Sequence, residues 1–388
     1  MRILLVGDYP ADPRLGSTKV LVKLQEEFRA LGHTCDLLLA DAIGDFPRNP
    51  YLRRALGPVT ALAAVRRQTR EHGPYDVIDV ASAEGFWIAA LRGPGLHRPA
   101  VVSRSNGIEH LNYERLLDDH REGLIHKPWT RRLLHPTVRL PQVAAAARFA
   151  DRLLLLNEQD RAFAIDRGWK RADEIDLVPH GVSTKFMLDA PSDDQRRGRG
   201  ILFCSSWAGM KGISYLTEAF ERLVRAGRRW NLSVVGGGLS VETIRADFAP
   251  IARPFVTIVD RAPEDELMAV YRTHDLMVLP STYEGFGLVV IEAMSQKLPV
   301  IATPVGCVRS LVEHERSGLV VPTRDAGALA AAIDRLMLDG ELRARCAQAA
   351  FKRVRGMTWS RTAQLTLEVY ERAIELGASR MERHAWPA

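Results

Sequence analysis

Short apolar runs alternate with longer stretches of helical period along the first half of the chain. Apolar positions repeat every three to four residues from Ser17 to Leu31, which predicts a helix that ends at Gly32. The apolar runs predict buried strands at Ile3–Val6, Cys35–Ala40, Val77–Val80, Ala100–Ser103 and Leu153–Leu156. Strands that alternate with helices at this spacing are typical of a parallel, doubly wound α/β sheet.

The same alternation starts again after residues 191–200, a polar segment with proline and glycine and no apolar period, which predicts a linker. A helix is predicted at Ser214–Ala226, and a last one at Ser360–Leu376. The strands predicted here are Ile201–Cys204, Leu232–Val235, Val256–Val259, Leu276–Leu279 and Val300–Ala302. The chain therefore predicts two doubly wound domains in tandem, with a cleft between them.

Length and composition fit this division. The chain has 388 residues, of which 46% are hydrophobic and 26% charged, and these values exclude a disordered or collagen-like protein. No apolar run reaches the roughly 18 residues that span a bilayer, and the apolar N-terminal stretch is too short for a signal peptide. Four cysteines lack CxxC spacing, so we expect no disulfide framework and a cytoplasmic location.

The net charge of +6 is mildly basic, and no nucleic-acid-binding motif accompanies it. Cations interleaved with Trp129 can lie on anionic lipid headgroups, which suggests peripheral membrane contact. The alternative is an ordinary exposed, arginine-rich surface. The residues concerned are Arg53, Arg54, Arg66, Arg67, Arg70, Lys127, Trp129, Arg131, Arg132 and Arg139. The isolated His126 and His135 are interpreted as surface residues.

The segment Pro280–Met294 carries the clearest chemical signal. A predicted strand ends, and a loop with Gly285 and Gly287 leads into a helix. Glycine lets a phosphate approach the backbone, and the first helical turn offers N–H groups and a partial positive charge. Open α/β sheets bind ligands at this end of their strands, so the segment predicts a diphosphate site.

Two acids flank this site. Glu284 precedes the helix and Glu292 lies within it, at most about 12 Å apart at the helical rise of 1.5 Å per residue. The carboxylate pair of a retaining glycosidase needs a separation of about 5 Å, so that role is not indicated. The two acids can instead hold opposite ends of one elongated ligand. For Glu292, the alternative is an ordinary acid on the helix surface.

Pro280–Met294 resembles the Glu-x7-Glu motif of the retaining glycosyltransferases of family 4, which have the GT-B fold. Further matches lie at Gly32-His33, Val178–Val182, Met210–Gly212, Val235–Gly238, Ser317–Val320 and Trp359 with Val369–Glu371. The resemblance implies two Rossmann-like domains facing a cleft. Residues 1–190 would bind the acceptor and residues 201–358 the nucleotide sugar, and residues 359–388 would form a helix that packs back on the N-terminal domain.

The resemblance also implies a role for each matched residue. Lys211 would neutralise the departing diphosphate, Glu284 would hold the donor sugar and Glu292 the ribose. Gly285, Phe286 and Gly287 would donate backbone hydrogen bonds to the phosphate and the sugar. The nucleotide base would lie between Arg261 and the loop with Gly236 and Gly237. Gly16 would approach the phosphates from the N-terminal domain. By themselves, Lys211 also fits a surface lysine and the glycine loop a mere turn.

Some positions depart from the family pattern. Ser206 stands where the family has an arginine, and Lys297 where it has a glycine. Asn106 takes the place of a histidine that points at the sugar, with His110 close by. The alternative for Asn106 and His110 is a role as helix caps or polar loop residues.

The function implied is transfer of a sugar from a nucleotide-sugar donor to a hydroxyl of a saccharide, glycolipid or small molecule. The acceptor would be recognised by the irregular stretch Glu109–Pro141, and polysaccharide or glycoconjugate biosynthesis is the expected setting. No Asp-x-Asp motif is present, so we expect no metal and no bound cofactor. The alternatives are a nucleotide-sugar epimerase or phosphorylase of the same fold, and a non-catalytic nucleotide-sugar-binding protein.

Overall fold

The computed structural model describes residues 1–44, 50–91, 98–123, 135–188, 198–260 and 262–384, and it divides into two units. Unit 1 comprises Met1–His180 together with Trp359–Ala388, and unit 2 comprises Gly181–Thr358. The chain therefore leaves unit 1, builds unit 2 and returns. Most of the predicted linker, residues 191–197, lies outside the described residues.

Unit 1 is built on a parallel sheet of six strands in the order β2-β1-β3-β4-β5-β6. Helices cover both faces, which explains why the strands read as continuous apolar runs. The five predicted strands are confirmed within two residues, whereas β6 was missed because Asp176 interrupts its apolar run. The strands are β1 (Arg2–Val6), β2 (Thr34–Leu38), β3 (Val77–Ala81), β4 (Ala100–Arg104), β5 (Arg152–Leu155) and β6 (Ile175–Leu177).

Two apolar clusters fill the space between this sheet and its helices, one around Val65 and Ile88 and the other around Leu155 and Trp169. The helices and helical turns of unit 1 are α1 (Gly16–Ala30), α2 (Ala40–Ile43), α3 (Pro50–His72), η1 (Ser82–Glu84), α4 (Gly85–Ala90), α5 (Glu109–Arg121), η2 (His135–Arg139), α7 (Leu140–Phe149), α8 (Glu158–Asp166), η3 (Ala172–Glu174) and α17 (Trp359–His384). The predicted first helix is confirmed as α1.

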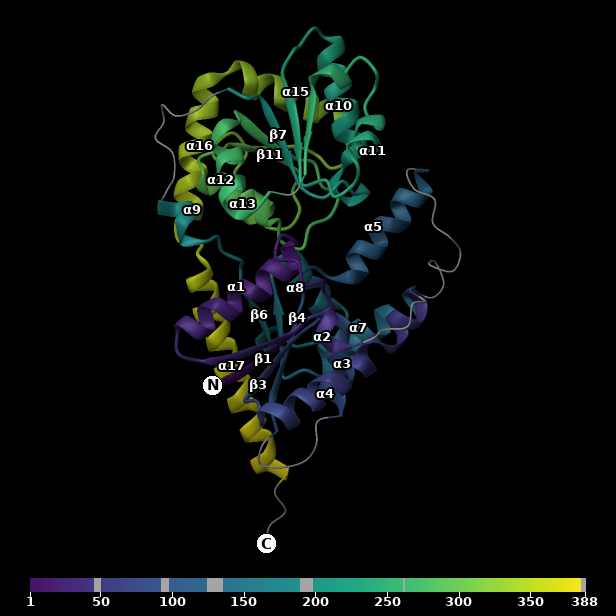
Figure 1. Cartoon of the computed structure of the whole chain (residues 1–388), viewed down its shortest axis with the longest axis vertical. Coiled ribbons are helices and arrows are strands. Elements are labelled where there is room, and N and C mark those ends of the chain that lie inside the picture. The colour runs from purple at the N-terminus through teal and green to yellow at the C-terminus, as the bar shows by residue number, and fades with distance from the viewer. Residues whose placement is uncertain (45–49, 92–97, 124–134, 189–197, 261, 385–388) are drawn as a thin grey trace. The chain divides into compact units, whose positions relative to one another are not determined.

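Helix α17 packs on unit 1, against α1, β4 and β5, and Figure 1 shows it in yellow along the purple-to-blue unit. A buried polar group fastens it. The Tyr370 hydroxyl donates to Asp79 at 2.6 Å, and Asp79 forms an ion pair with Arg104 at 2.5 Å. All three side chains are fully buried. The expectation that the last helix returns to the N-terminal domain is confirmed.

Unit 2 has a second parallel six-stranded sheet, in the order β12-β11-β10-β7-β8-β9. The five strands predicted here have the observed bounds, and the missed strand β12 has only two residues. The strands are β7 (Ile201–Cys204), β8 (Leu232–Val235), β9 (Val256–Val259), β10 (Leu276–Leu279), β11 (Val300–Ala302) and β12 (Leu319–Val320). The α/β class with two doubly wound sheets is thus confirmed.

The order of strands in each sheet reverses at one point. In unit 2 the reversal lies between β7 and β10, and in unit 1 between β1 and β3. The loops that follow these strand pairs diverge at the carboxyl edge and leave room for a ligand. The helices and helical turns of unit 2 are α9 (Thr184–Leu188), η5 (Gly209–Lys211), α10 (Ile213–Arg225), α11 (Val241–Ala246), η6 (Arg253–Phe255), α12 (Glu264–Thr273), α13 (Leu288–Ser295), α14 (Val308–Leu311), α15 (Ala326–Leu338) and α16 (Gly340–Val354).

Candidate functional site

The reversal point of unit 2 brings Lys211 and Glu284 together, although 73 residues separate them. Lys211 follows β7 and Glu284 follows β10, so both lie at the carboxyl edge of the sheet. The ammonium nitrogen of Lys211 lies 2.7 Å from a Glu284 carboxylate oxygen, which also accepts a 2.8 Å hydrogen bond from Ser281. The two side chains are 16% and 8% exposed, so Lys211 is not an ordinary surface lysine.

The backbone holds the two loops that carry this pair. The Thr282 N–H donates to the carbonyl of Met210 at 2.9 Å. Gly212 has a φ of +71°, and a Cβ there would lie 1.9 Å from the carbonyl oxygen of Pro280. Only glycine fits this contact and this left-handed conformation. The pair is therefore positioned by main-chain packing before any ligand binds.

The glycine loop after Glu284 forms the start of α13. Gly287 has a φ of +96° and precedes the first helical residue, Leu288. The loop after β11 supports it from behind, because the N–H of Cys307 donates to the carbonyl of Phe286 at 2.8 Å. A Cβ on Gly306 would lie 2.4 Å from that same oxygen. The helix N-terminus thus has a fixed position beside Glu284, whose carboxylate pairs with Lys211, and a helix N-terminus near a lysine is suited to an anion.

Glu292 lies inside the protein, 4% exposed, rather than on the helix surface. One of its carboxylate oxygens accepts a 2.9 Å hydrogen bond from the hydroxyl of Tyr271 on α12. Burial, together with the nearby Cys204 and Glu292, raises the pKa of Tyr271 well above its usual value. Tyr271 therefore stays protonated and orients the Glu292 carboxylate.

The loop after β8 lies beside the loop after β7, because the N–H of Trp207 donates to the carbonyl of Gly237 at 2.8 Å. Gly236 has a φ of +78°. A Cβ on Gly237 would lie 2.4 Å from the side chain of Ile244. Gly236 therefore has a backbone conformation that favours glycine, and a side chain at position 237 would require Ile244 to shift. Arg261, predicted to flank the base, lies outside the described residues.

Two of the predicted residues belong to unit 1. Gly16 is the first residue of α1 rather than a loop residue. Asn106 follows β4, and its side-chain N–H donates to the Tyr9 hydroxyl at 3.2 Å, while its amide oxygen is buried without a hydrogen-bond partner among the described residues. His110 contacts the ring of Trp169, and burial lowers its pKa to about 4, so it is a neutral packing residue. The Nδ1 atom of His110 is likewise buried without a hydrogen-bond partner among the described residues.

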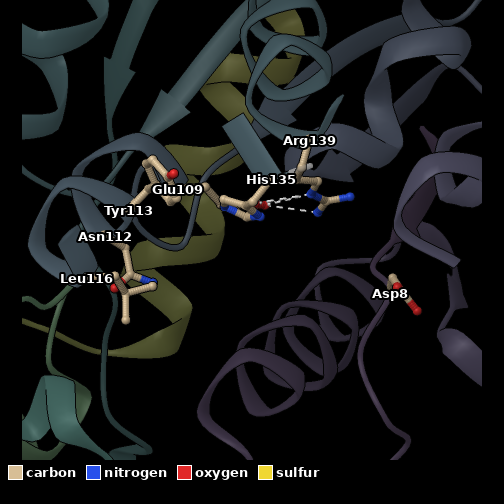
Figure 2. Close-up of a pocket in the computed structure, with 7 residues that line it drawn as sticks. All are labelled: Asp8, Glu109, Asn112, Tyr113, Leu116, His135 and Arg139. Carbon is tan, nitrogen blue, oxygen red and sulfur yellow. Dashed lines mark hydrogen bonds and ion pairs between the residues drawn. The ribbon is translucent and has the colours of Figure 1, made fainter. Parts of the chain in front are cut away.

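Unit 1 also contains a pocket of about 280 Å³ that the sequence motifs did not reveal. Its lining residues, shown in Figure 2, are Asp8, Glu109, Asn112, Tyr113, Leu116, His135 and Arg139. Four of them form one face of α5, at positions i, i+3, i+4 and i+7. The expectation that the stretch from Glu109 to Pro141 is irregular is therefore wrong for its first part, because Glu109–Arg121 is a helix. The interpretation of His135 as a surface residue is wrong, because it lines this pocket and stacks near Tyr113.

An ion-pair network closes one side of the pocket. Arg139 donates to Glu84 at 2.6 Å and to Glu109 at 2.9 Å. Burial raises the pKa of Glu84 despite the attraction of Arg139. Burial acts in the same direction on Glu109, but the charge and hydrogen bonds of Arg139 outweigh it and lower the pKa of Glu109. Placing Arg139 among the lipid-facing cations is therefore wrong, because its guanidinium group is engaged inside unit 1. The neighbouring residues of that prediction lie outside the described residues, as does His126; they are Lys127, Trp129, Arg131 and Arg132.

Residues 192–353 match the family model described as "Glycosyl transferases group 1". A "D-inositol 3-phosphate glycosyltransferase" from Thermobispora bispora is 30% identical over 345 residues, which cover 78% of this chain and 79% of the relative. The chain belongs to this family. A protein of the same name from Pseudarthrobacter chlorophenolicus is 27% identical over 80% of this chain and 73% of its own length.

Solved structures confirm that this group 1 glycosyltransferase has the GT-B fold. Sucrose-phosphate synthase from Thermosynechococcus elongatus superposes with a TM-score of 0.74 at 23% identity, over 97% of this chain and 99% of its own. HepE from Anabaena, solved in complex with UDP-glucose, has a TM-score of 0.67 at 19% identity, over 98% and 100% of the two chains. The glycosyltransferase has no helix, within its described parts, that is long and apolar enough to cross a membrane.

Proposed function

We propose that the protein transfers a sugar from a nucleotide-sugar donor to an acceptor hydroxyl with retention of configuration. The observation that carries this proposal is the buried Lys211–Glu284 pair beside the N-terminus of α13. The complex of HepE with UDP-glucose supports a nucleotide-sugar donor, since the two proteins share a fold.

The reaction breaks the bond between the sugar and the donor phosphate, and the departing diphosphate gains negative charge. The Lys211 ammonium group and the first-turn N–H groups of α13 would stabilise that charge without reorganisation. The acceptor oxygen attacks on the face that the phosphate leaves, and its proton passes to the departing phosphate oxygen. Glu284 would position Lys211 and accept a hydrogen bond from the sugar. We assign no protein nucleophile.

Glu292 would bind the ribose of the donor. Since Tyr271 donates to one carboxylate oxygen, the carboxylate has a fixed orientation. The change Glu292→Ala should therefore weaken donor binding more than it lowers the rate at which bound donor is turned over. A rise in KM with little change in kcat is the expected signature.

We propose that transfer needs no metal ion. Among the residues that the structure describes, no group of three His, Cys, Asp or Glu side chains is placed to hold one. Treatment with EDTA should leave turnover unchanged. Loss of activity with EDTA and its recovery with a divalent cation would contradict this proposal.

The deciding experiment incubates the protein with a panel of nucleotide sugars, with and without acceptors, and measures release of the nucleoside diphosphate. Release that depends on an acceptor supports a transferase. Release without an acceptor, together with an altered sugar, supports an epimerase, and binding without turnover supports a binding protein. The variant Lys211→Ala should lose turnover. The control Lys185→Ala removes an exposed lysine of the same unit, 54% exposed, and should not.

We also propose that unit 1 contacts an anionic membrane surface. One face of α3 exposes Leu52, Leu56 and Val59, followed by Arg66 and Arg70. Co-sedimentation should be stronger with phosphatidylglycerol vesicles than with phosphatidylcholine vesicles, and Leu56→Glu should reduce it. Equal sedimentation of wild type and variant with the anionic vesicles would refute this surface.

A further inference from the structure

The pocket of unit 1 carries charged groups that the donor site does not use. It lies where β1 and β4 end, because Asp8 follows β1 and the N-terminus of α5 follows β4. Glu84, which follows β3, accepts a hydrogen bond from the lining residue Arg139. The strand order reverses between β1 and β3, and open α/β sheets bind ligands at such a point. The pocket is therefore a ligand site by position as well as by shape.

Negative charge dominates this pocket. Asp8 and Glu109 line it directly, and Glu84 lies behind Arg139. All three guanidinium nitrogens of Arg139 donate to Glu84 or Glu109, at 2.6 to 3.2 Å. Arg139 is the one lysine or arginine among the described lining residues, and Figure 2 shows its bonds to Glu109 as dashed lines. An incoming phosphate would meet two lining carboxylates, and Arg139 could bind it only by giving up bonds that all three of its nitrogens make to two carboxylates.

Of the two lining carboxylates, Asp8 has the weaker ion pair. Its ion pair with Arg53, at 2.9 Å, is partly exposed, with 44% of the Arg53 side chain in contact with solvent. Exposed pairs of this kind contribute little free energy and exchange readily. Asp8 can therefore turn to a cation in the pocket, opposite the side chains of α5 (Figure 2). A ligand ammonium group would gain a charge-assisted hydrogen bond there.

The face of α5 supplies groups that suit a hydroxylated ring. Asn112 carries an amide and Tyr113 a phenol, and both types of group bind sugar hydroxyls. Leu116 and the Tyr113 ring offer apolar surface for the C–H face of such a ring. The volume of about 280 Å³ is suited to one or two rings.

We infer that this pocket binds a hydroxylated acceptor whose bound part carries an ammonium group, such as an amino sugar or an aminocyclitol, and that it rejects phosphorylated acceptors. The inference rests on the proposed function and specifies the acceptor class. It separates this chain from the relatives whose names specify inositol 3-phosphate, since that acceptor is an anion.

The first test measures binding by titration calorimetry in two matched sets: glucosamine, glucose and glucose 6-phosphate, then 2-deoxystreptamine, myo-inositol and inositol 3-phosphate. In at least one set the amine should bind about tenfold more tightly than the neutral compound, because one partly exposed charge-assisted hydrogen bond contributes about this much affinity. The phosphate should bind least. If no amine binds more tightly than its neutral and phosphorylated counterparts, the inference is overturned.

Variants then test whether Asp8 binds the ammonium group. Asp8→Asn should lower amine affinity about tenfold and leave the neutral compound nearly unaffected. The matched control Asp118→Asn removes an equal charge from an α5 side chain that is 51% exposed and outside the described pocket lining, and it should change neither. Equal losses in the two variants would overturn the role of Asp8.

A second variant acts in the opposite direction. Arg53→Ala removes the partner of Asp8 and should raise amine affinity, whereas a merely structural effect would lower it. Binding of a nucleotide sugar, measured in parallel, should be the same in all these variants. If the wild type binds no nucleotide sugar, the proposed function fails. The order of the affinities for amine, neutral and phosphorylated compounds still decides which class of compound the pocket binds.

Discussion

Lys211→Met is the sharpest perturbation of the donor site, because methionine keeps most of the volume of lysine and removes its charge. At the observed 2.7 Å and an effective dielectric constant of about 20, the attraction between Lys211 and Glu284 is about 6 kcal/mol. Desolvation cancels much of this attraction, but removing one partner leaves a buried carboxylate uncompensated. We expect a loss of about 3 kcal/mol in the free energy of unfolding.

Turnover should fall separately from stability. Loss of one preorganised charge at the departing group typically costs a factor of about 10² to 10³ in kcat. The double variant Lys211→Met/Glu284→Gln removes both charges, so it should recover most of the stability and none of the turnover. Urea unfolding and initial rates of diphosphate release provide the two readouts. If the double variant regains wild-type turnover, Lys211 does not act on the departing diphosphate and the reasoning fails.

Three further predictions concern the scaffold. Gly212→Ala should abolish turnover and lower Tm, because its Cβ would meet the Pro280 carbonyl oxygen at 1.9 Å; unchanged rates would contradict this packing. Tyr370→Phe should lower the free energy of unfolding by about 2 kcal/mol in urea titrations, since the buried Asp79 loses a hydrogen bond; an unchanged midpoint would exclude that bond. Burial raises the pKa of Asp160 to about 7, above its unfolded value near 3.8, so its contribution to stability is present at low pH and is lost as the pH rises through 7. Relative to Asp160→Asn, the wild type should lose about 2 kcal/mol between pH 5 and pH 8, and parallel pH profiles would refute this.

The sequence located most of the fold through local patterns. The five strands of unit 2 from Ile201–Cys204 to Val300–Ala302 have their predicted bounds, since each is a short apolar run between polar residues. Strand β6 was missed because Asp176 interrupts its apolar run, and β12 because it has only two residues, whereas the three consecutive apolar residues of β11 were found. The glycine loop before α13 was also identified from the sequence, because Gly285 and Gly287 stand between a predicted strand and a predicted helix, whereas the positive φ of Gly287 is known from the structure alone.

Local sequence patterns did not predict the pocket of unit 1. The helix α5 was not predicted, and its stretch was expected to be irregular. Nothing local places Asp8 opposite this helix or puts Arg139 between Glu84 and Glu109. His135 was read as a surface residue because a lone histidine has no pattern. Burial and pairing arise from contacts between segments far apart in the chain.

The sequence by itself determined the strand and helix alternation, the glycine loop before α13 and the family resemblance, because these depend on neighbours within about one helical turn or one strand. The tertiary structure alone decided which distant groups share a site. Lys211 meets Glu284 only because β7 and β10 are adjacent at the reversal point of their sheet. Arg139 is neutralised only because folding buries it between two carboxylates, and that pairing, rather than the count of charges, sets the character of the pocket.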